Sequence, residues 1–71
     1  MKTKLAENIK YYRKQMGMTQ SQLAKKLNGK KSLVCNYEKG YSTPDILTVC
    51  KLAKFFDITV DELIDYQEDI I

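Results

Sequence analysis

Residues 19–40 read TQSQLAKKLNGKKSLVCNYEKG and contain the most informative helix signals of the chain. Thr19 and Gln22 have the spacing of a capping box, which marks the first turn of a helix. Asn28-Gly29 interrupts that helix, because both residues tolerate a positive φ, and Gly40 ends the helical pattern that follows. Two short helices joined by a tight turn are therefore predicted, at about 19–27 and 31–39, with inward-facing Leu23, Ala24, Leu27, Val34 and Tyr37.

One more helix is predicted before this stretch, at about 4–16. Its apolar residues recur at steps of four, three and four positions, which places them on one face. Gly17 can adopt the left-handed conformation that ends a helix. The residues on that face are Leu5, Ile9, Tyr12 and Met16.

Two further helices are predicted after residue 40. Thr43-Pro44 suits the start of the first, because threonine caps a helix and proline fits its first turn. Thr59 and Glu62 repeat the capping-box spacing and start a last helix over about 60–66. The earlier of the two is expected to end at Asp57 and to place inward Ile46, Val49, Leu52, Ala53 and Phe56.

The length of 71 residues fits one domain. No run of alternating β-branched residues predicts a strand. We therefore expect an all-α, compact five-helix domain over 1–71, with its core at about 4–66 and a C-terminal tail at 67–71.

Charge is divided unevenly along the chain. Residues 1–40 hold ten Lys or Arg and two Glu, a net charge of +8, whereas residues 41–71 hold two Lys and seven Asp or Glu, a net charge of −5. Such asymmetry indicates a polyanion as partner of the first half, although a solvated lysine-rich surface would explain it equally well.

Several classes of function lack their residues in this sequence. There is no histidine, and Cys35 and Cys50 are the two cysteines, so we expect neither a metal site nor a cofactor. No catalytic set and no glycine-rich phosphate loop is present, which argues against an enzyme. Without a signal peptide or an apolar run of roughly 20 residues, the chain is expected to be cytoplasmic, with no membrane partner.

The pattern from Met18 to Gly40 resembles the lambda-repressor-like (Cro/cI-type) helix-turn-helix family. Met18-Thr-Gln-Ser-Gln-Leu-Ala-Lys-Lys-Leu27 is followed without a gap by Ser32, Val34 and Asn36-Tyr-Glu-Lys-Gly40. The match extends over nearly the whole chain, through Ile9 to Gly17 before it and through Pro44, Leu52-Ala53 and Thr59-Val-Asp-Glu-Leu63 after it.

The resemblance implies that the second helix of the pair enters the major groove of DNA. It implies base contacts for Lys31, Ser32 and Asn36, and a thymine methyl contact for Leu33. It implies a phosphate contact for Gln20 and an inner salt bridge between Arg13 and Glu38. It also implies that the loop after the helix, at Tyr41, Ser42 and Thr43, lies along the DNA backbone. We add Lys30 in the turn and Lys39 at the end of the helix as further DNA contacts.

The turn departs from the family pattern at three positions. The family's glycine falls on Asn28 and its next apolar residue on Gly29. The polar N-cap falls on Lys30, which cannot accept a hydrogen bond. The start of the following helix is therefore left open between neighbouring residues.

The resemblance implies a sequence-specific double-stranded DNA-binding transcriptional regulator, in the first place a repressor at the nucleoid of a bacterial or phage-type system. An activator or a restriction-modification controller would use the same fold. The alternative from another class is a protein-interaction module, such as an antitoxin or adaptor. No small-molecule ligand is expected.

A homodimer on a palindromic operator is expected, because one such domain reads few base pairs. The acidic C-terminal half is predicted to form the interface, since the basic half faces DNA. The candidate interface residues are Ile64, Tyr66, Ile70 and Ile71.

Overall fold

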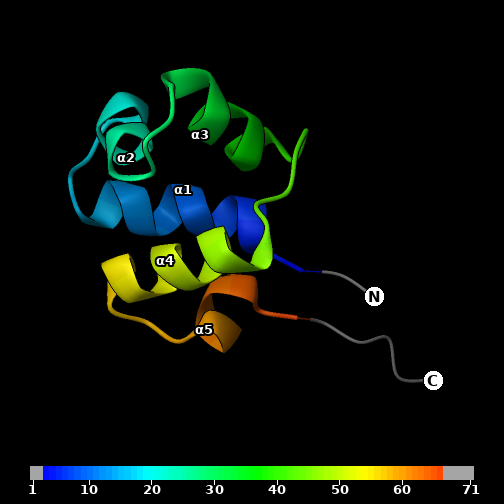
Figure 1. The fold of residues 1–71 in the computed structure, drawn as a ribbon. Coiled ribbons are helices and arrows are strands. Elements are labelled where there is room, and N and C mark those ends of the chain that lie inside the picture. Colours follow the sequence, from blue (N-terminus) through cyan, green and yellow to red (C-terminus); the bar gives the residue numbers. More distant parts are fainter. Residues whose placement is uncertain (1–2, 67–71) are drawn as a thin grey trace.

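The computed structural model describes residues 3–66, and this part of the chain is all-helical. Helix α1 lies in the middle, with α2 and α3 on one side of it and α4 and α5 on the other (Figure 1). This arrangement separates the two predicted DNA-contacting helices from the last two. The five helices are α1 (Leu5–Gln15), α2 (Gln20–Lys26), α3 (Lys31–Lys39), α4 (Ile46–Phe56) and α5 (Val60–Ile64).

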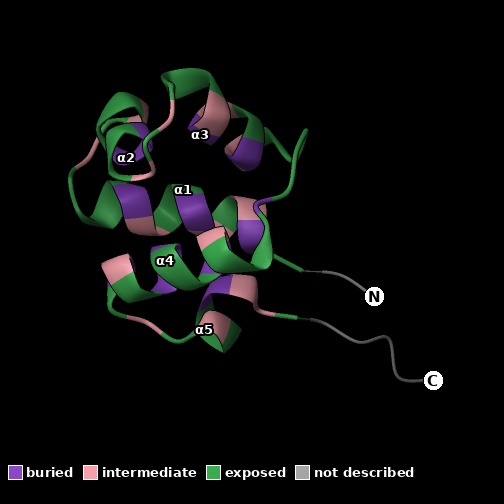
Figure 2. Ribbon diagram, in the orientation of Figure 1, coloured by how far each residue is buried: buried purple, intermediate pink, exposed green. Residues whose placement is uncertain are grey.

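Each helix contributes one large side chain that is almost completely buried in a single core. All five are at most 1% exposed, and Figure 2 shows a buried segment on each helix. Burial of a large aliphatic side chain contributes about 1.5–3 kcal/mol, so packing of these faces stabilises helices too short to persist alone. The five residues are Ile9, Leu23, Val34, Leu52 and Leu63.

Two helices begin at the capping boxes that the sequence predicts. The amide of Gln22 donates to Thr19 Oγ1 at 3.1 Å, and the amide of Thr19 donates to Gln22 Oε1 at 2.8 Å. Thr59 and Glu62 make the same reciprocal pair at the start of α5. These bonds satisfy amides that a helix start leaves without a partner, and they fix the first residues of α2 and α5.

The start of α4 lies two residues later than predicted. Asp45, not Thr43, is the N-cap, and its carboxylate accepts a hydrogen bond from the Thr48 amide at 2.9 Å. Hydrogen bonds from Thr48, from its side chain and then from its amide, lower the pKa of Asp45. Aspartate caps a helix better than threonine does, and Pro44 is buried just before the cap rather than in the first turn.

Predictions at three helix ends are also wrong. Met16 follows the last residue of α1 and is 48% exposed, and Ile46, the first residue of α4, is 67% exposed. The last helix ends at Ile64 rather than near Tyr66, because Asp65 adopts a positive φ of 46°. At Met16 and Ile46 the apolar periodicity continues past the point at which neighbouring helices cover it.

Candidate nucleic-acid interface

The turn between α2 and α3 sets how the two helices cross. Asn28 takes the left-handed conformation, with φ at 57°, and Gly29 does not. The Gly29 amide then donates to the Ala24 carbonyl at 2.8 Å, which closes the end of α2. Ala24 is 1% exposed, as its predicted place at the crossing requires. Asn28 therefore adopts the left-handed conformation at the position where the family pattern has glycine.

Leu33 fills the space beside the turn glycine. A Cβ built on Gly29 would lie 2.5 Å from Leu33 Cδ2, so the leucine side chain occupies the place of a side chain at position 29. Leu33 is half-buried against the core. Helix α3 begins at Lys31, with Lys30 as an N-cap that makes no side-chain hydrogen bond. Leu33 thus lies on the edge of α3 nearest the turn and not at the middle of its exposed face.

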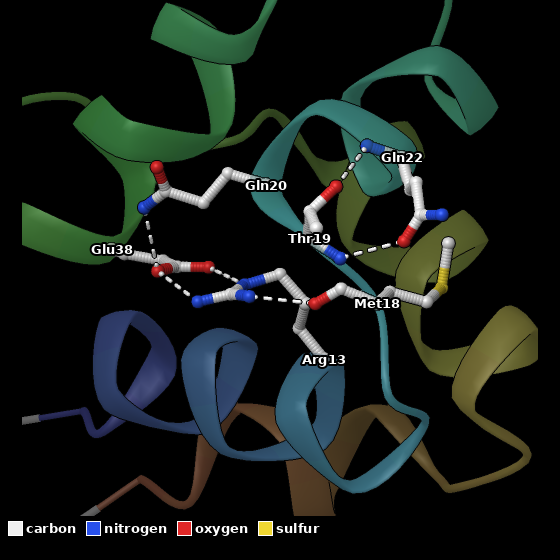
Figure 3. Close-up of polar contacts among 6 residues, drawn as sticks. All are labelled: Arg13, Met18, Thr19, Gln20, Gln22 and Glu38. Atoms are coloured by element: carbon white, nitrogen blue, oxygen red, sulfur yellow. Dashed lines mark hydrogen bonds and ion pairs between the residues drawn. The ribbon is translucent and has the colours of Figure 1, made fainter.

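An ion pair under α3 holds three helices in fixed relation (Figure 3). Arg13 Nε donates to Glu38 Oε2 at 2.6 Å, and its Nη2 donates to Oε1 at 3.1 Å. Both side chains are nearly buried, at 9% and 3% exposure. Arg13 Nη1 also donates to the Met18 carbonyl at 2.7 Å, so one guanidinium joins α1, the residue before the cap of α2, and α3.

Gln20 completes this network from the first turn of α2. Its Nε2 donates to Glu38 Oε1 at 3.0 Å, which turns the amide toward the ion pair (Figure 3). The second hydrogen of Nε2 is still available to a phosphate oxygen. Lys31 lines the same shallow hollow as Gln20, together with Arg13, Gly17, Met18, Thr19 and Ser21. The hollow therefore brings together one lysine and one amide donor beside the start of α2.

The outer face of α3 carries a polar row opposite its buried side. Val34 and Tyr37 face the core, and at 100° per residue the opposite direction falls on Ser32, Asn36 and Lys39. All three are exposed. The side chains of Ser32 and Asn36 make no hydrogen bond within residues 3–66. Their donors and acceptors are free to bind an external partner.

The loop after α3 extends the exposed polar surface. Tyr41 is 77% exposed, and Lys39 Nζ lies 5.9 Å from the centre of its ring. The amide of Tyr41 donates to the Asn36 carbonyl at 2.9 Å, so it is used within the fold. A contact from this loop to a ligand would thus come from the tyrosine side chain and from the exposed Ser42 and Thr43 hydroxyls.

The predicted dimer residues are only partly within the described structure. Ile64 is half-buried, and its carbonyl accepts a hydrogen bond from the Lys4 amide at 2.8 Å. Tyr66 is 48% exposed. Ile70 and Ile71 lie outside the described residues.

An exposed apolar pair that the sequence patterns missed lies at the start of α4. Ile46 and Leu47 are 67% and 70% exposed. Figure 1 shows this start at the same end of the molecule as the last residues of α5. The apolar periodicity of α4 gave no signal for this exposure, because it places Ile46 on the same face as the buried Val49, Leu52, Ala53 and Phe56.

Within residues 3–66, no helix is long and apolar enough to cross a membrane. The same residues hold no group of three or more potential metal ligands. The candidate site comprises the exposed face of α3, its flanking turn and loop, and the hollow at the start of α2.

A family model described as helix-turn-helix matches residues 9–63, which include α2, α3 and their crossing. The chain belongs to the Cro/cI-type helix-turn-helix family. This confirms the resemblance drawn from the sequence and the all-α, five-helix fold.

Relatives of this helix-turn-helix domain are named as transcriptional regulators. An uncharacterized HTH-type transcriptional regulator of Methanocaldococcus jannaschii is 38% identical over 92% of this chain and 98% of its own length. The HTH-type transcriptional regulator ImmR of Bacillus subtilis is 34% identical over 90% of this chain. The match covers 50% of ImmR, so it says nothing about the other half of that protein.

A solved structure shares the fold of this helix-turn-helix domain. The crystal structure of a transcriptional regulator from Listeria innocua superposes with a TM-score of 0.88 and 31% identity. The match covers 100% of this chain and 66% of the Listeria chain. The chain thus belongs to a family of transcriptional regulators.

Proposed function

We propose that the chain is a sequence-specific transcriptional regulator that binds double-stranded DNA by inserting α3 into the major groove. The observation that carries the proposal is the outer row of α3. Asn36 and Ser32 present free hydrogen-bonding groups along one line of a helix, and an α-helix fits the width of the major groove. An asparagine side chain can donate to and accept from the edge of an adenine at once.

We infer that residues of this row contact bases and that the residues around it contact phosphates. Asn36 and Ser32 contact base edges, with Lys39 beside them. Lys30 and Lys31 bind phosphates, and the position of Lys31 in the hollow with Gln20 favours a phosphate over the base contact implied by the resemblance. Because Leu33 packs beside Gly29 and against the core, only the exposed part of its side chain is available to a thymine methyl group. The remaining phosphate contacts are assigned to Gln20, Tyr41, Ser42 and Thr43.

The arrangement of charge supports the same orientation. The basic residues 1–40 include α2 and α3, on one side of α1, and the acidic α5 lies on the other side (Figure 1). A polyanion approaching α3 meets positive charge, and the negative charge of the last helix points away from it.

We further propose that the regulator acts as a repressor and as a two-fold dimer. The reason for preferring a repressor is that a small domain bound within a promoter is enough to exclude RNA polymerase. Activation is the alternative, since one relative, BcrR of Enterococcus faecalis, is named an activator. The dimer surface we propose contains Ile64 and Tyr66, as the sequence predicts, together with the exposed Ile46 and Leu47 at the same end of the molecule. Two-fold pairing would place the two recognition helices roughly 34 Å apart on DNA.

A gel shift with genomic fragments at two salt concentrations tests the DNA proposal. Retention of a small set of fragments at the higher salt supports specific binding, since phosphate contacts alone weaken steeply with salt. Uniform loss of all fragments would favour a protein-interaction module. Sedimentation equilibrium on a retained fragment tests the dimer: two chains per site are expected for the protein, and one for Leu47→Glu.

A further inference from the structure

An open apolar groove lies between α2 and α4, away from the recognition helix. It has a volume of about 310 Å³, and no residue of α3 lines it. Helices α2 and α4 do not pack extensively on each other. Leu23 and Leu52 form the buried floor, at 1% and 0% exposure. Leu27 and Phe55 form partly exposed apolar walls.

The rim of this groove is basic. Its other lining residues are Lys26, Lys51 and Lys54, all exposed, and no acidic side chain lines it. Lys26 and Lys54 make no ion pair with any residue from 3 to 66. Lys51 acts electrostatically on Asp45, one of whose carboxylate oxygens is already used in capping α4.

From this combination we propose that the groove binds an acidic amphipathic helix of a partner protein. The apolar walls and floor accept the apolar side of a third helix, with Phe55 as an aromatic contact. Three lysines around the floor pair with carboxylates on either flank of such a helix. DNA would use the lysines alone and leave Leu27 and Phe55 uncovered.

The partner site does not overlap the proposed DNA site. The groove is lined by the later residues of α2 and α4, whereas the hollow beside Lys31 is lined by the first residues of α2. A regulator bound to DNA through α3 would therefore still offer the groove to a second protein.

The test uses synthetic helical peptides and the ¹⁵N-labelled full chain, followed by amide chemical shifts. The first peptide carries leucines at i, i+3, i+4 and i+7 with flanking glutamates. In a second the glutamates are lysines, and in a third the leucines are serines. Saturable shifts at the amides of Leu27 and Phe55 are expected with the first peptide only. The absence of saturable shifts there, or equal binding of the lysine peptide, overturns the proposal.

Matched variants separate the groove from net charge. Lys26→Gln/Lys51→Gln/Lys54→Gln should weaken binding of the first peptide roughly tenfold, since three rim pairs are removed. Lys4→Gln/Lys10→Gln/Lys14→Gln removes the same charge from exposed positions outside the groove and should leave the affinity within about twofold. Equal effects of the two triples would overturn the proposal.

Two further readouts distinguish other occupants. The groove triple should retain its preferred DNA fragment, and peptide and DNA should bind together, so a failure of DNA binding leaves the groove test intact. Displacement of the peptide by DNA would assign the lysines to the DNA interface and contradict the proposal. A changed sedimentation mass of the groove triple without peptide would show that a second copy fills the groove, which also contradicts it.

Discussion

Glu38 is the residue on which the geometry of the site depends most. It accepts hydrogen bonds from Arg13 and Gln20, so it joins helices on both sides of the turn. No buried side-chain nitrogen or oxygen in residues 3–66 lacks a partner. A nearly buried pair adds little net stability while it is intact, because its burial has a desolvation cost. The main effect of the Arg13–Glu38 pair is to fix the position of α3 relative to α1 and α2.

Removal of one member of this pair should be worse than removal of both. Glu38→Ala strands the Arg13 guanidinium and should lower the free energy of unfolding by about 3–5 kcal/mol, a large part of the total for a small domain. Arg13→Met/Glu38→Leu should cost less, because no charge is left buried. Chemical denaturation monitored by circular dichroism measures both, with Glu7→Ala as an exposed control. A double change that costs as much as Glu38→Ala, or more, would contradict this account of the pair.

Asp45 should make the stability of α4 depend on pH. Its folded-state pKa is lowered by the hydrogen bonds from Thr48, so its contribution is present above the ordinary pKa and is lost as pH falls through the lowered value. Asp45→Ala should lower the melting temperature at neutral pH, and the difference should shrink in acid. Asp45→Asn keeps a capping acceptor that does not titrate. A difference between aspartate and alanine that is constant with pH would contradict the assigned cap.

The turn between α2 and α3 shows how two departures from the family pattern compensate each other. Asn28 supplies the positive φ, and Leu33 fills the space left empty at Gly29. Gly29 itself has no positive φ, so an alanine there is not strained by the backbone. The obstacle is the end of one flexible leucine side chain.

Gly29→Ala should therefore be coupled to Leu33. Alone it should be destabilising, because its Cβ displaces Leu33 Cδ2 from its packed position. In a Leu33→Ala background the same change should be neutral or stabilising by about 0.4–1 kcal/mol, since alanine restricts the unfolded chain. A double-mutant cycle by thermal denaturation measures the coupling. Equal effects of Gly29→Ala in both backgrounds would show that Leu33 does not fill this space.

The helices were predictable where capping residues and periodicity agreed. Thr19 and Thr59 fixed the starts of α2 and α5, and Gly40 the end of α3, because these signals act through neighbouring backbone groups. Thr43 was wrongly predicted as the cap of α4, and Ile46 as a buried residue. Both errors arise because the choice between two capping residues, and the extent of the core at a helix end, depend on tertiary packing.

The candidate site was predictable to a similar degree. The ion pair of Arg13 with Glu38 is present as expected from the resemblance. The bond from Gln20 to Glu38, the inward turn of Leu33 and the groove between α2 and α4 were not expected. Each depends on side chains from different helices, whose relative positions no local pattern contains.

The molecule has a basic side that holds α2 and α3, and the acidic α5 lies on the other side of α1. Both proposed protein contacts, the dimer surface at Ile46 and Leu47 and the groove at Phe55, lie outside the outer row of α3. The account as a whole therefore depends on whether that row reads bases.

Selection of binding sites from random double-stranded DNA tests this directly, with the wild-type chain, Asn36→Ala and Lys31→Ala compared at one salt concentration. Asn36→Ala should lose preference at one base pair per half-site, at a cost of about 1–3 kcal/mol for the preferred sequence. Lys31→Ala should weaken all sequences alike and reduce the salt dependence, because it removes a phosphate contact. An unchanged sequence preference for Asn36→Ala would contradict the claim that the outer row of α3 faces the bases.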